Sequence, residues 1–310
     1  MPHKAISFAF FLLAVYLLIS TPSAAQQVAD TLFQPHVSVP AYKAGAGQTV
    51  LIDEGHHNFH TMEGRYLAFA RLLEMDGYVV KPHRGRFTLT DLGRANILVI
   101  SNALAAENEE DWYLPVFSAF DSTEITVVRN WVKDGGALLL IADHMPFAGA
   151  ASPLAAEFGI RMANGFAVDS KTENGRMRFA RSDGSLADHP ITQGRNTSEH
   201  VDSLISFTGQ AFRLDGTGES LMMLGSNVVL LMPEVAWQFS KLTPSISASR
   251  MLQGAVIQYG KGRVAVFGEA AMFSAQVAGP ERRPAGMNDP SAPQNAQFLL
   301  NVLHWLSGLL

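Results

Sequence analysis

Short apolar runs that end in acidic, imidazole or amide side chains recur along this chain, and they constrain its fold more than any other feature. Three runs of this kind are Thr49–Ile52, Ile97–Ile100 and Ala137–Ala142. Between them, apolar residues recur every three or four positions, as over Thr61–Met75, which predicts helices. Strands that alternate with helices at these lengths predict an α/β fold whose mostly parallel central sheet carries helices on both faces.

Several local signals set expected element boundaries. Asp121 and Glu124 have the spacing of a capping box and predict the start of a helix. The strands predicted over Ala255–Tyr259 and Arg263–Phe267 flank Gly260-Lys261-Gly262, so we expect an antiparallel hairpin near the C-terminus. Ser291 and Gln294 again have capping-box spacing and predict a final helix.

The N-terminus has the pattern of a secretory signal peptide. Lys4 precedes the apolar run Ala5–Ile19, and small residues lead to a cleavage site after Ala25. A short membrane anchor is the alternative, although about 15 apolar residues fall short of the roughly 20 that span a bilayer. We therefore expect a signal peptide at 1–25, a secreted or periplasmic protein, and no stable membrane span after cleavage.

The remaining chain reads as a leader and one domain. Residues 26–48 contain Pro35, Pro40, Gly45 and Gly47 and lack sustained periodicity, which is typical of a leader segment. The domain is predicted over 49–310, with a less regular insertion over about 152–251. Within this insertion the pattern predicts only a short helix near Leu154–Phe158 and then short strands separated by Gly, Asp and Pro.

Composition excludes several classes of function. The chain of 310 residues contains no cysteine, so it has no disulfide, thiolate metal site or cysteine nucleophile. Lys and Arg number 23 against 28 Asp and Glu, without a basic run, so nucleic acid is not an expected partner. Gly-x-Ser-x-Gly, Gly-x-Gly-x-x-Gly and Walker motifs are also absent.

Carboxylates and imidazoles follow four predicted strands, where ligands bind in open parallel sheets. These side chains could form one pocket around a divalent metal that activates water, because Zn²⁺, Mn²⁺ and Fe²⁺ accept both ligand types. The catalytic candidates are Asp53, Glu54, His57 and Glu269. The candidate metal ligands are His56, His57, Asp143 and His144. His60 lies in the same stretch as the first group.

Each candidate also has a structural interpretation. One histidine of the His56-His57-Asn58-Phe59-His60 stretch could cap the helix while another packs on the sheet, and Asp53 could bond loop amides. Glu269 could cap the following helix. His189 could satisfy the turn that contains it. The sequence leaves these alternatives open.

Four tryptophans add a second functional hypothesis, because indole rings can stack on sugars. Trp131 and Trp305 lie in predicted helices and are expected in the core. Trp112 and Trp237 lie outside them. A glycan-binding or protein-binding domain without catalysis is therefore the alternative to a hydrolase.

Several strings resemble uncharacterised secreted members of the class I glutamine amidotransferase-like superfamily. The strings are Val50–His57, Gly135–His144, His189–Gly194 and Gly262–Glu269, and the likeness spans about Thr49 to Leu310. The resemblance implies a flavodoxin-like three-layer sandwich. Related branches include trehalose-utilisation-like proteins and noncatalytic domains of sugar-processing enzymes, which implies a small-molecule or glycan ligand.

The sequence departs from the catalytic pattern of that superfamily. Its amidotransferases use a cysteine nucleophile at a strand–helix elbow and a His and Glu on a later strand. Here Asp143-His144 occupies the elbow-like position, and Glu269 follows Gly268 rather than a histidine. Cysteine-dependent glutamine hydrolysis is thus excluded, and a metal-assisted hydrolase acting on a carbohydrate-related substrate remains the first hypothesis.

Overall fold

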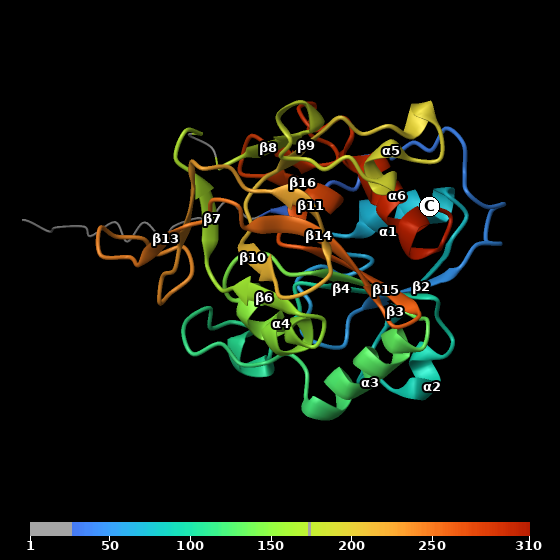
Figure 1. Cartoon of the computed structure of the whole chain (residues 1–310), viewed down its shortest axis with the longest axis horizontal. Coiled ribbons are helices and arrows are strands. Elements are labelled where there is room, and N and C mark those ends of the chain that lie inside the picture. Colours follow the sequence, from blue (N-terminus) through green and yellow to red (C-terminus); the bar gives the residue numbers. More distant parts are fainter. Residues whose placement is uncertain (1–26, 173–174) are drawn as a thin grey trace, which may run out of the picture.

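A computed structural model describes residues 27–172 and 175–310, so the predicted signal peptide at 1–25 lies outside the described residues. Its main feature is a nine-stranded sheet with the order β3-β2-β4-β5-β15-β14-β10-β6, in which β11 also pairs with β14 (Figure 1). The first half of this sheet is parallel. Its strands are β2 (Thr49–Asp53), β3 (Val79–His83), β4 (Ile97–Ser101), β5 (Ala137–Ile141) and β15 (Gly262–Phe267).

The second half of the sheet is antiparallel, so the sheet is mixed and the expectation of a mostly parallel sheet is wrong in this respect. Its strands are β6 (Ile160–Ala163), β10 (Ala211–Leu214), β11 (Glu219–Met223) and β14 (Leu252–Tyr259). Three of these belong to the region that the sequence pattern left undefined. The predicted hairpin is confirmed as β14–β15, in which Tyr259 pairs with Gly262.

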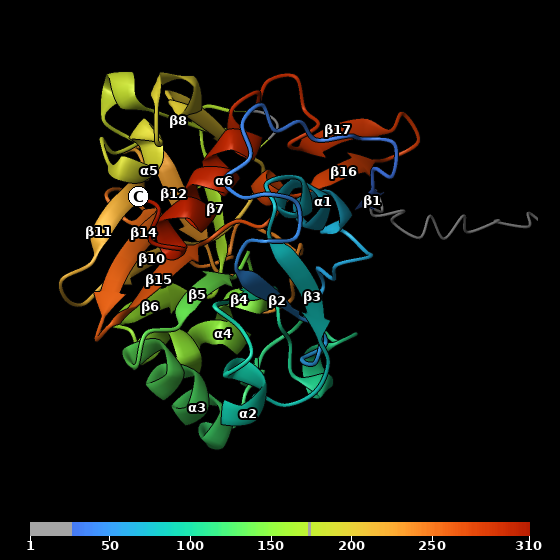
Figure 2. The same ribbon diagram turned by 90° about the vertical axis from the view of Figure 1, so that its right-hand side faces the viewer.

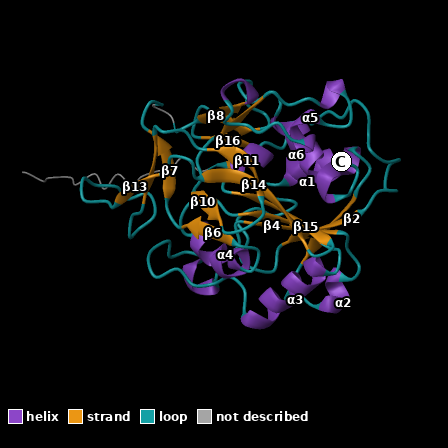
Figure 3. Ribbon diagram, viewed as in Figure 1, coloured by secondary structure: helices purple, strands orange, loops and turns teal. Residues whose placement is uncertain are grey.

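Helices lie on both faces of the sheet (Figure 3). On one face are α1 (Leu67–Met75), α5 (Pro190–Gln193) and α6 (Asn295–Leu306); on the other are α2 (Leu89–Leu92), α3 (Ser122–Lys133) and α4 (Phe147–Ala156). The predicted capping box of α3 is confirmed, since the Asp121 and Glu124 side chains each accept a hydrogen bond from the other's backbone N–H. Helices thus cover both faces, as the alternating pattern predicts.

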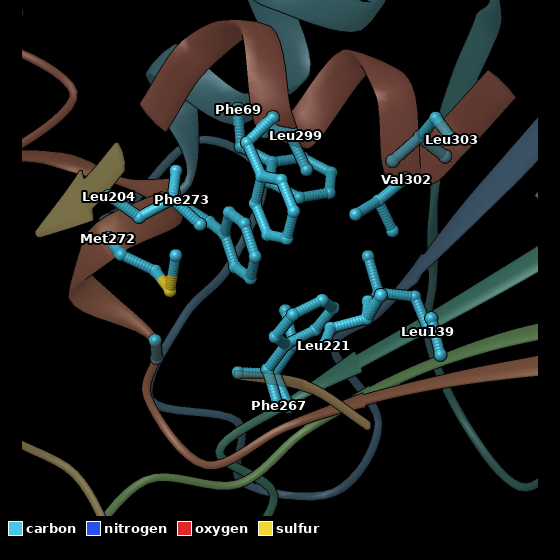
Figure 4. Packing of buried hydrophobic residues seen from close by; sticks show 14 of the residues in the cluster. Phe69, Leu139, Leu204, Leu221, Phe267, Met272, Phe273, Leu299, Val302 and Leu303 are labelled. Atoms are coloured by element: carbon cyan, nitrogen blue, oxygen red, sulfur yellow. The ribbon is translucent and has the colours of Figure 1, made fainter. Parts of the chain in front are cut away.

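Alternate side chains of the buried strands supply two apolar cores. Leu139 and Phe267 face α1 and α6, where they pack with Phe69, Leu299 and Val302 (Figure 4). The neighbouring strand residues Leu138 and Leu140 face the other helix layer and pack with Val128 and Val132. This alternation follows from the two-residue period of a strand buried on both faces.

Two helix starts differ from expectation. The helix predicted from Thr61 begins only at Leu67, because Gly64 and Tyr66 donate to the Thr61 carbonyl and form turns instead. The final helix begins at Asn295 without a side-chain cap. Gln294 accepts from the backbone of Asp202 and Ser203 instead, which ties the helix start to another segment.

The remaining strands form small sheets beside the main one. β7 (Phe166–Asp169), β12 (Val228–Leu231) and β13 (Ser245–Ser247) form one at the left of Figure 1. β8 (Met177–Ala180) pairs with β9 (Ser203–Ser206). β1 (Val28–Ala29) pairs with β16 (Ala275–Ala278), which pairs with β17 (Arg283–Gly286), beside α1 (Figure 2).

Short 3-10 turns complete the described elements: η1 (Ala106–Asn108), η2 (Arg181–Asp183), η3 (Thr197–Glu199) and η4 (Ala271–Phe273). The described part of the predicted leader packs onto the domain, as Ala41 donates its backbone N–H to Asp76 and Arg195 donates to the Val39 carbonyl. Over residues 27–172 and 175–310, no helix combines the length and apolarity that a membrane crossing requires.

Candidate functional site

The four strands that end in polar residues are neighbours. β2, β4, β5 and β15 run parallel in that order, so the segments after them meet at one edge of the sheet. This adjacency brings together the segments that begin at Asp53, Asn102, Asp143 and Glu269. Individual side chains within these segments nevertheless have different surroundings.

Asp53 and His56 form an internal ion pair. His56 Nδ1 lies 2.9 Å from Asp53 Oδ1, and His56 Nε2 lies 3.0 Å from Glu124 Oε1 on α3. Asp53 is fully buried and also accepts from Asn58 Nδ2 and Gly55 N. Both imidazole nitrogens of His56 are therefore occupied by carboxylates, and the ring joins β2 to α3.

Burial disfavours the charged form of His56, but the hydrogen bonds and charges of Asp53 and Glu124 outweigh it and raise its pKa above 6.5. The ring packs against Phe87 and Phe120 at centroid distances of 4.6 and 4.8 Å. A protonated His56 uses both N–H groups and has no lone pair for a metal. This arrangement matches the structural interpretation of the residue.

Glu54 and His57 also have partners within the protein. Glu54 accepts from Met62 N at 2.8 Å and from Arg84 Nε at 3.0 Å. His57 lies on the surface, where its Nδ1 is 2.7 Å from Glu109 Oε2. Glu54 thus holds the turn before α1, and His57 holds the loop that follows β4.

Glu269 is fully buried and caps a turn. Its two oxygens accept from Ala271 N at 2.7 Å and from Met272 N at 2.8 Å, at the start of η4. Burial, with the charge of Asp143 added, raises its pKa well above 4.5, although the backbone hydrogen bonds oppose this shift. Ala270 is the N-cap residue of η4, and Glu269 before it bonds the first backbone N–H groups of this turn, which resembles its alternative structural role.

Asn102 connects the ends of three segments. Its Oδ1 accepts from Asp143 N at 2.9 Å, and its Nδ2 lies 3.2 Å from His60 Nδ1. It has a left-handed backbone, with φ of 49°, a conformation that Asn tolerates better than most residues. Asn102 thereby fixes His60 beside Asp143 and His144. We call these four residues the carboxyl-end site.

His60 is buried and holds one unsatisfied nitrogen. Because Asn102 Nδ2 donates to Nδ1, the neutral ring carries its hydrogen on Nε2, a buried atom with no partner among the described residues. Burial, together with the charges of Arg65 and His144, lowers its pKa to about 3. The ring therefore stays neutral over the ordinary pH range.

His144 differs from the other strand-end histidines because one nitrogen is free. Its Nδ1 lies 2.7 Å from the Met145 carbonyl oxygen, so Nδ1 carries the hydrogen and the neutral ring has a lone pair on Nε2. Nε2 has no protein partner in the described chain and is not fully enclosed, although His144 as a whole is only 6 % exposed. It can accept a hydrogen bond from a ligand.

Aromatic side chains surround His144. Phe166 stacks on its ring with a centroid distance of 4.5 Å, and Trp237 meets it edge-on at 4.6 Å. Phe147 and Trp112 lie farther out, at 5.6 and 6.2 Å. We call these four side chains the aromatic group. Phe166 and Phe147 are buried, and the group reaches the surface at Trp237, which is 52 % exposed.

The predicted metal ligands do not form a single cluster. His56 is bound on both sides, His57 pairs with Glu109, and Asp143 accepts from His144 N and from Ala270 N. Within 27–172 and 175–310, no group of three or more His, Asp or Glu side chains is arranged to hold a metal ion. The metal site stays a prediction that elemental analysis would test.

Two other features lie away from the carboxyl-end site. His189 accepts from Ile191 N through Nδ1 and caps α5, so its ring satisfies the turn. A polar cavity of about 390 Å³ lies at the opposite ends of the strands, where Asn96, Gly136 and Arg263 form part of its lining. Ligands of parallel sheets bind at the carboxyl ends, so we place the candidate site there.

Some residues of the site have no clear signal in the sequence. Asp143 and His144 follow an evident strand, and Trp112 and Trp237 are tryptophans outside helices. Phe166 lies on β7, and nothing in the chain before it predicts that it stacks on His144. Arg65 also belongs to no recognised sequence motif. Only tertiary contacts identify these two.

Comparison with known proteins indicates the fold. No protein-family model matches the chain, and no curated protein matches it. Among solved structures, the mmIFT52 N-terminal domain has a TM-score of 0.59 at 13 % identity, covering 83 % of this chain and 97 % of that one. A cytoplasmic protein from Salmonella typhimurium has a TM-score of 0.51 at 13 % identity, covering 84 % and 98 %.

Structural neighbours also include ThuA-like proteins. A putative ThuA-like protein from Bacteroides uniformis has a TM-score of 0.45 at 10 % identity, covering 88 % of this chain and 94 % of that one. At these identities the first two similarities support a shared mixed α/β fold, and they carry no activity to this chain.

Proposed function

We propose that this protein is a noncatalytic carbohydrate-binding domain whose ligand lies against His144 and Trp237. The observation that carries the proposal is the free Nε2 of His144 beside a half-exposed indole ring. A sugar presents hydroxyl groups at its edges and apolar C–H groups on its faces. A hydrogen-bond acceptor next to an aromatic face matches both kinds of group.

More aromatic surface extends from this point. Phe239 is 44 % exposed, and its ring lies 5.1 Å from that of Phe166 and 6.5 Å from that of Trp237. Trp237 and Phe239 therefore offer two neighbouring exposed rings. This spacing suits a ligand of more than one sugar ring.

The surroundings of the predicted catalytic residues favour binding over hydrolysis. Asp53 and Glu269 are fully buried, and each accepts at least two hydrogen bonds within the protein. Glu54 and His57 hold neighbouring loops. Of the proposed acid–base groups, only His57 keeps an unpaired nitrogen in the described chain, its Nε2, and that ring lies on the surface in a pair with Glu109, so the metal-assisted hydrolase has less support than glycan binding.

The proposal also covers the cellular location and the superfamily of the protein. We propose a secreted or periplasmic protein, because residues 1–25 carry the signal-peptide pattern. We also propose membership of the class I glutamine amidotransferase-like superfamily with a flavodoxin-like core, without the cysteine nucleophile. The helices on both faces and the parallel strands support that assignment.

A glycan array tests the function. Mature protein and the variants Trp237→Ala and His144→Ala would be applied to it, with Met75→Ala as a control, since Met75 is 44 % exposed and lies on α1. We expect selective glycan binding by wild type and Met75→Ala, with at least tenfold weaker binding by the other two. Binding that persists in both site variants, or no binding by folded wild type, would contradict the proposal.

A further inference from the structure

Arg65 lies next to the aromatic group and lacks a carboxylate partner in the described part of the chain. Its guanidinium carbon is 3.7 Å from the centroid of the Phe59 ring. The Phe59 ring lies 5.5 Å from both Trp112 and Phe147, and each of those rings contacts His144. A chain of ring contacts thus joins Arg65 to the carboxyl-end site.

The hydrogen bonds of Arg65 are incomplete. Nη1 donates to the Phe59 carbonyl at 3.3 Å, whereas Nε is buried and has no partner. No described carboxylate lies within salt-bridge distance of this guanidinium, since the ion pairs of the described chain all involve other residues. Burying part of a cation without a counterion opposes folding, so such an arrangement calls for an anion.

Other partly buried arginines of the chain are satisfied. Arg129 pairs with Glu157 at 3.0 Å, Arg181 pairs with Asp188 at 2.7 Å, and Arg195 pairs with Glu199. Arg263 donates to two backbone carbonyl groups. Compared with these, Arg65 has neither a carboxylate partner in the described chain nor an acceptor for its Nε.

The charge of Arg65 acts on the site itself. After burial, which is the larger cause, the charge of Arg65 lowers the pKa of His60, one of the four residues of the carboxyl-end site. The exposed loop at 107–111 carries four acidic residues, and one of them, Glu109, pairs with His57. This loop would repel a polyanion more strongly than a single anionic group, because the repulsion grows with the charge of the ligand.

We propose that Arg65 binds an anionic substituent of the ligand, so that the preferred ligand is a sugar bearing a single carboxylate or sulfate group. A planar guanidinium pairs well with either oxyanion. The sugar ring would stack on the aromatic group while its acidic substituent lies at Arg65. This inference rests on the proposed carbohydrate binding and names the class of sugar.

The first test compares sugars that differ in one group. The dissociation constants of methyl β-D-glucuronide, methyl β-D-glucoside 6-sulfate and methyl β-D-glucoside would be measured by ligand-observed NMR. For wild type we expect at least one acidic sugar to bind about tenfold tighter than the glucoside. Comparison of the two acidic sugars shows whether the site prefers a carboxylate or a sulfate group. Arg65→Gln should bind all three within about twofold of one another.

Arg129→Gln is the matched control, because Arg129 is also partly buried but is paired, and it lies on α3. It should keep the wild-type preference for the acidic sugar. Raising the salt concentration should reduce that preference in wild type, because salt screens charge pairs. Unfolding midpoints would establish that both variants are folded.

A second test needs no sugar. Thermal unfolding would be followed in sodium sulfate and in sodium chloride of equal ionic strength, and the extra stabilisation by sulfate should be larger for wild type than for Arg65→Gln. If sugars bind without an Arg65-dependent preference for acid, the inference is overturned and carbohydrate binding stands.

If no sugar binds but sulfate stabilises through Arg65, the anion site is supported and carbohydrate binding is contradicted. If neither effect depends on Arg65 and no sugar binds, both proposals are overturned.

Discussion

The Nδ1 atom of His144 lies 2.7 Å from the carbonyl oxygen of Met145, and this one hydrogen bond determines what the imidazole can do. It places the hydrogen on Nδ1 and leaves the lone pair of Nε2 without a partner in the described chain. His56 shows the opposite case, because both of its nitrogens bond carboxylates. Two histidines that follow parallel strands of the same sheet thus differ, because His56 bridges two carboxylates and His144 keeps an unpaired nitrogen.

His56 should contribute strongly to stability. Replacing it with Ala leaves Asp53 and Glu124 buried without their shared cation. We therefore expect the free energy of unfolding, measured by urea titration, to fall by about 3 kcal/mol. His57→Ala is the control and should change stability by no more than about 0.5 kcal/mol, since its pair with Glu109 is exposed. Equal effects of the two substitutions would contradict the bridging role.

The stabilisation by His56 should depend on pH. Its pKa in the folded protein is raised above the value of 6.5, so the contribution is fully present below about pH 6.5 and is lost as pH rises through the folded pKa. The difference in unfolding free energy between wild type and His56→Gln should therefore shrink on the alkaline side. A difference that grows with pH would contradict the ion pair.

His60 should have the opposite pH dependence. Its pKa of about 3 lies below the unfolded value of 6.5, so the unfolded chain takes up a proton first and stability is lost as pH falls from about 6.5 toward 3. Between pH 6.5 and 4, the free energy of unfolding of wild type should fall by about 3 kcal/mol more than that of His60→Gln. Urea unfolding at intervals over that pH range measures this difference. If the unfolding free energies of wild type and His60→Gln change in parallel with pH, a neutral buried His60 is refuted.

Asn102 should matter through both its amide and its backbone. Asn102→Ala removes the hydrogen bonds to Asp143 N and His60 and places alanine at a left-handed φ of 49°. We therefore expect the free energy of unfolding to fall by about 2 to 3 kcal/mol. Asn102→Gly removes the same bonds without the steric strain and should be about 1 kcal/mol more stable than the Ala variant. An equally stable pair of variants would show that backbone strain is unimportant there.

Tightly bound transition metal is not expected in the purified protein. Both nitrogens of His56 are occupied and His57 pairs with Glu109, so the predicted ligands would have to give up existing partners. Elemental analysis before and after chelation measures this directly. Stoichiometric metal that is lost in His56→Ala and in Asp143→Ala would instead revive the metal-assisted hydrolase.

The parallel half of the sheet could be predicted because its signal is local. Leu138 to Ile141 are apolar at every position, as a strand buried on both faces requires, and the hairpin at Gly260 to Gly262 has a characteristic turn. The antiparallel half could not be predicted in the same way. Its strands β6 and β10 have four residues each and depend on pairing partners distant in sequence.

The candidate site could be predicted only in outline. The sequence places carboxylates and histidines at the ends of neighbouring strands, but it does not reveal that Glu124, on α3, occupies the second nitrogen of His56. It also cannot place Phe166 and Trp237 on His144, since they come from the weakly patterned insertion at 152–251. Which polar atoms stay free is decided by tertiary contacts.

The central claim is that ligand binds at the free Nε2 of His144, and ¹⁵N NMR of histidine-labelled protein tests it most directly. His144→Gln assigns the resonances, and the glycan with the highest affinity on the array is then titrated. We predict an unprotonated Nε2 signal for the neutral ring that shifts on addition of the glycan in wild type and in Met75→Ala. A hydrogen on Nε2 instead of Nδ1, or an unchanged His144 signal while glycan binds, would contradict the account.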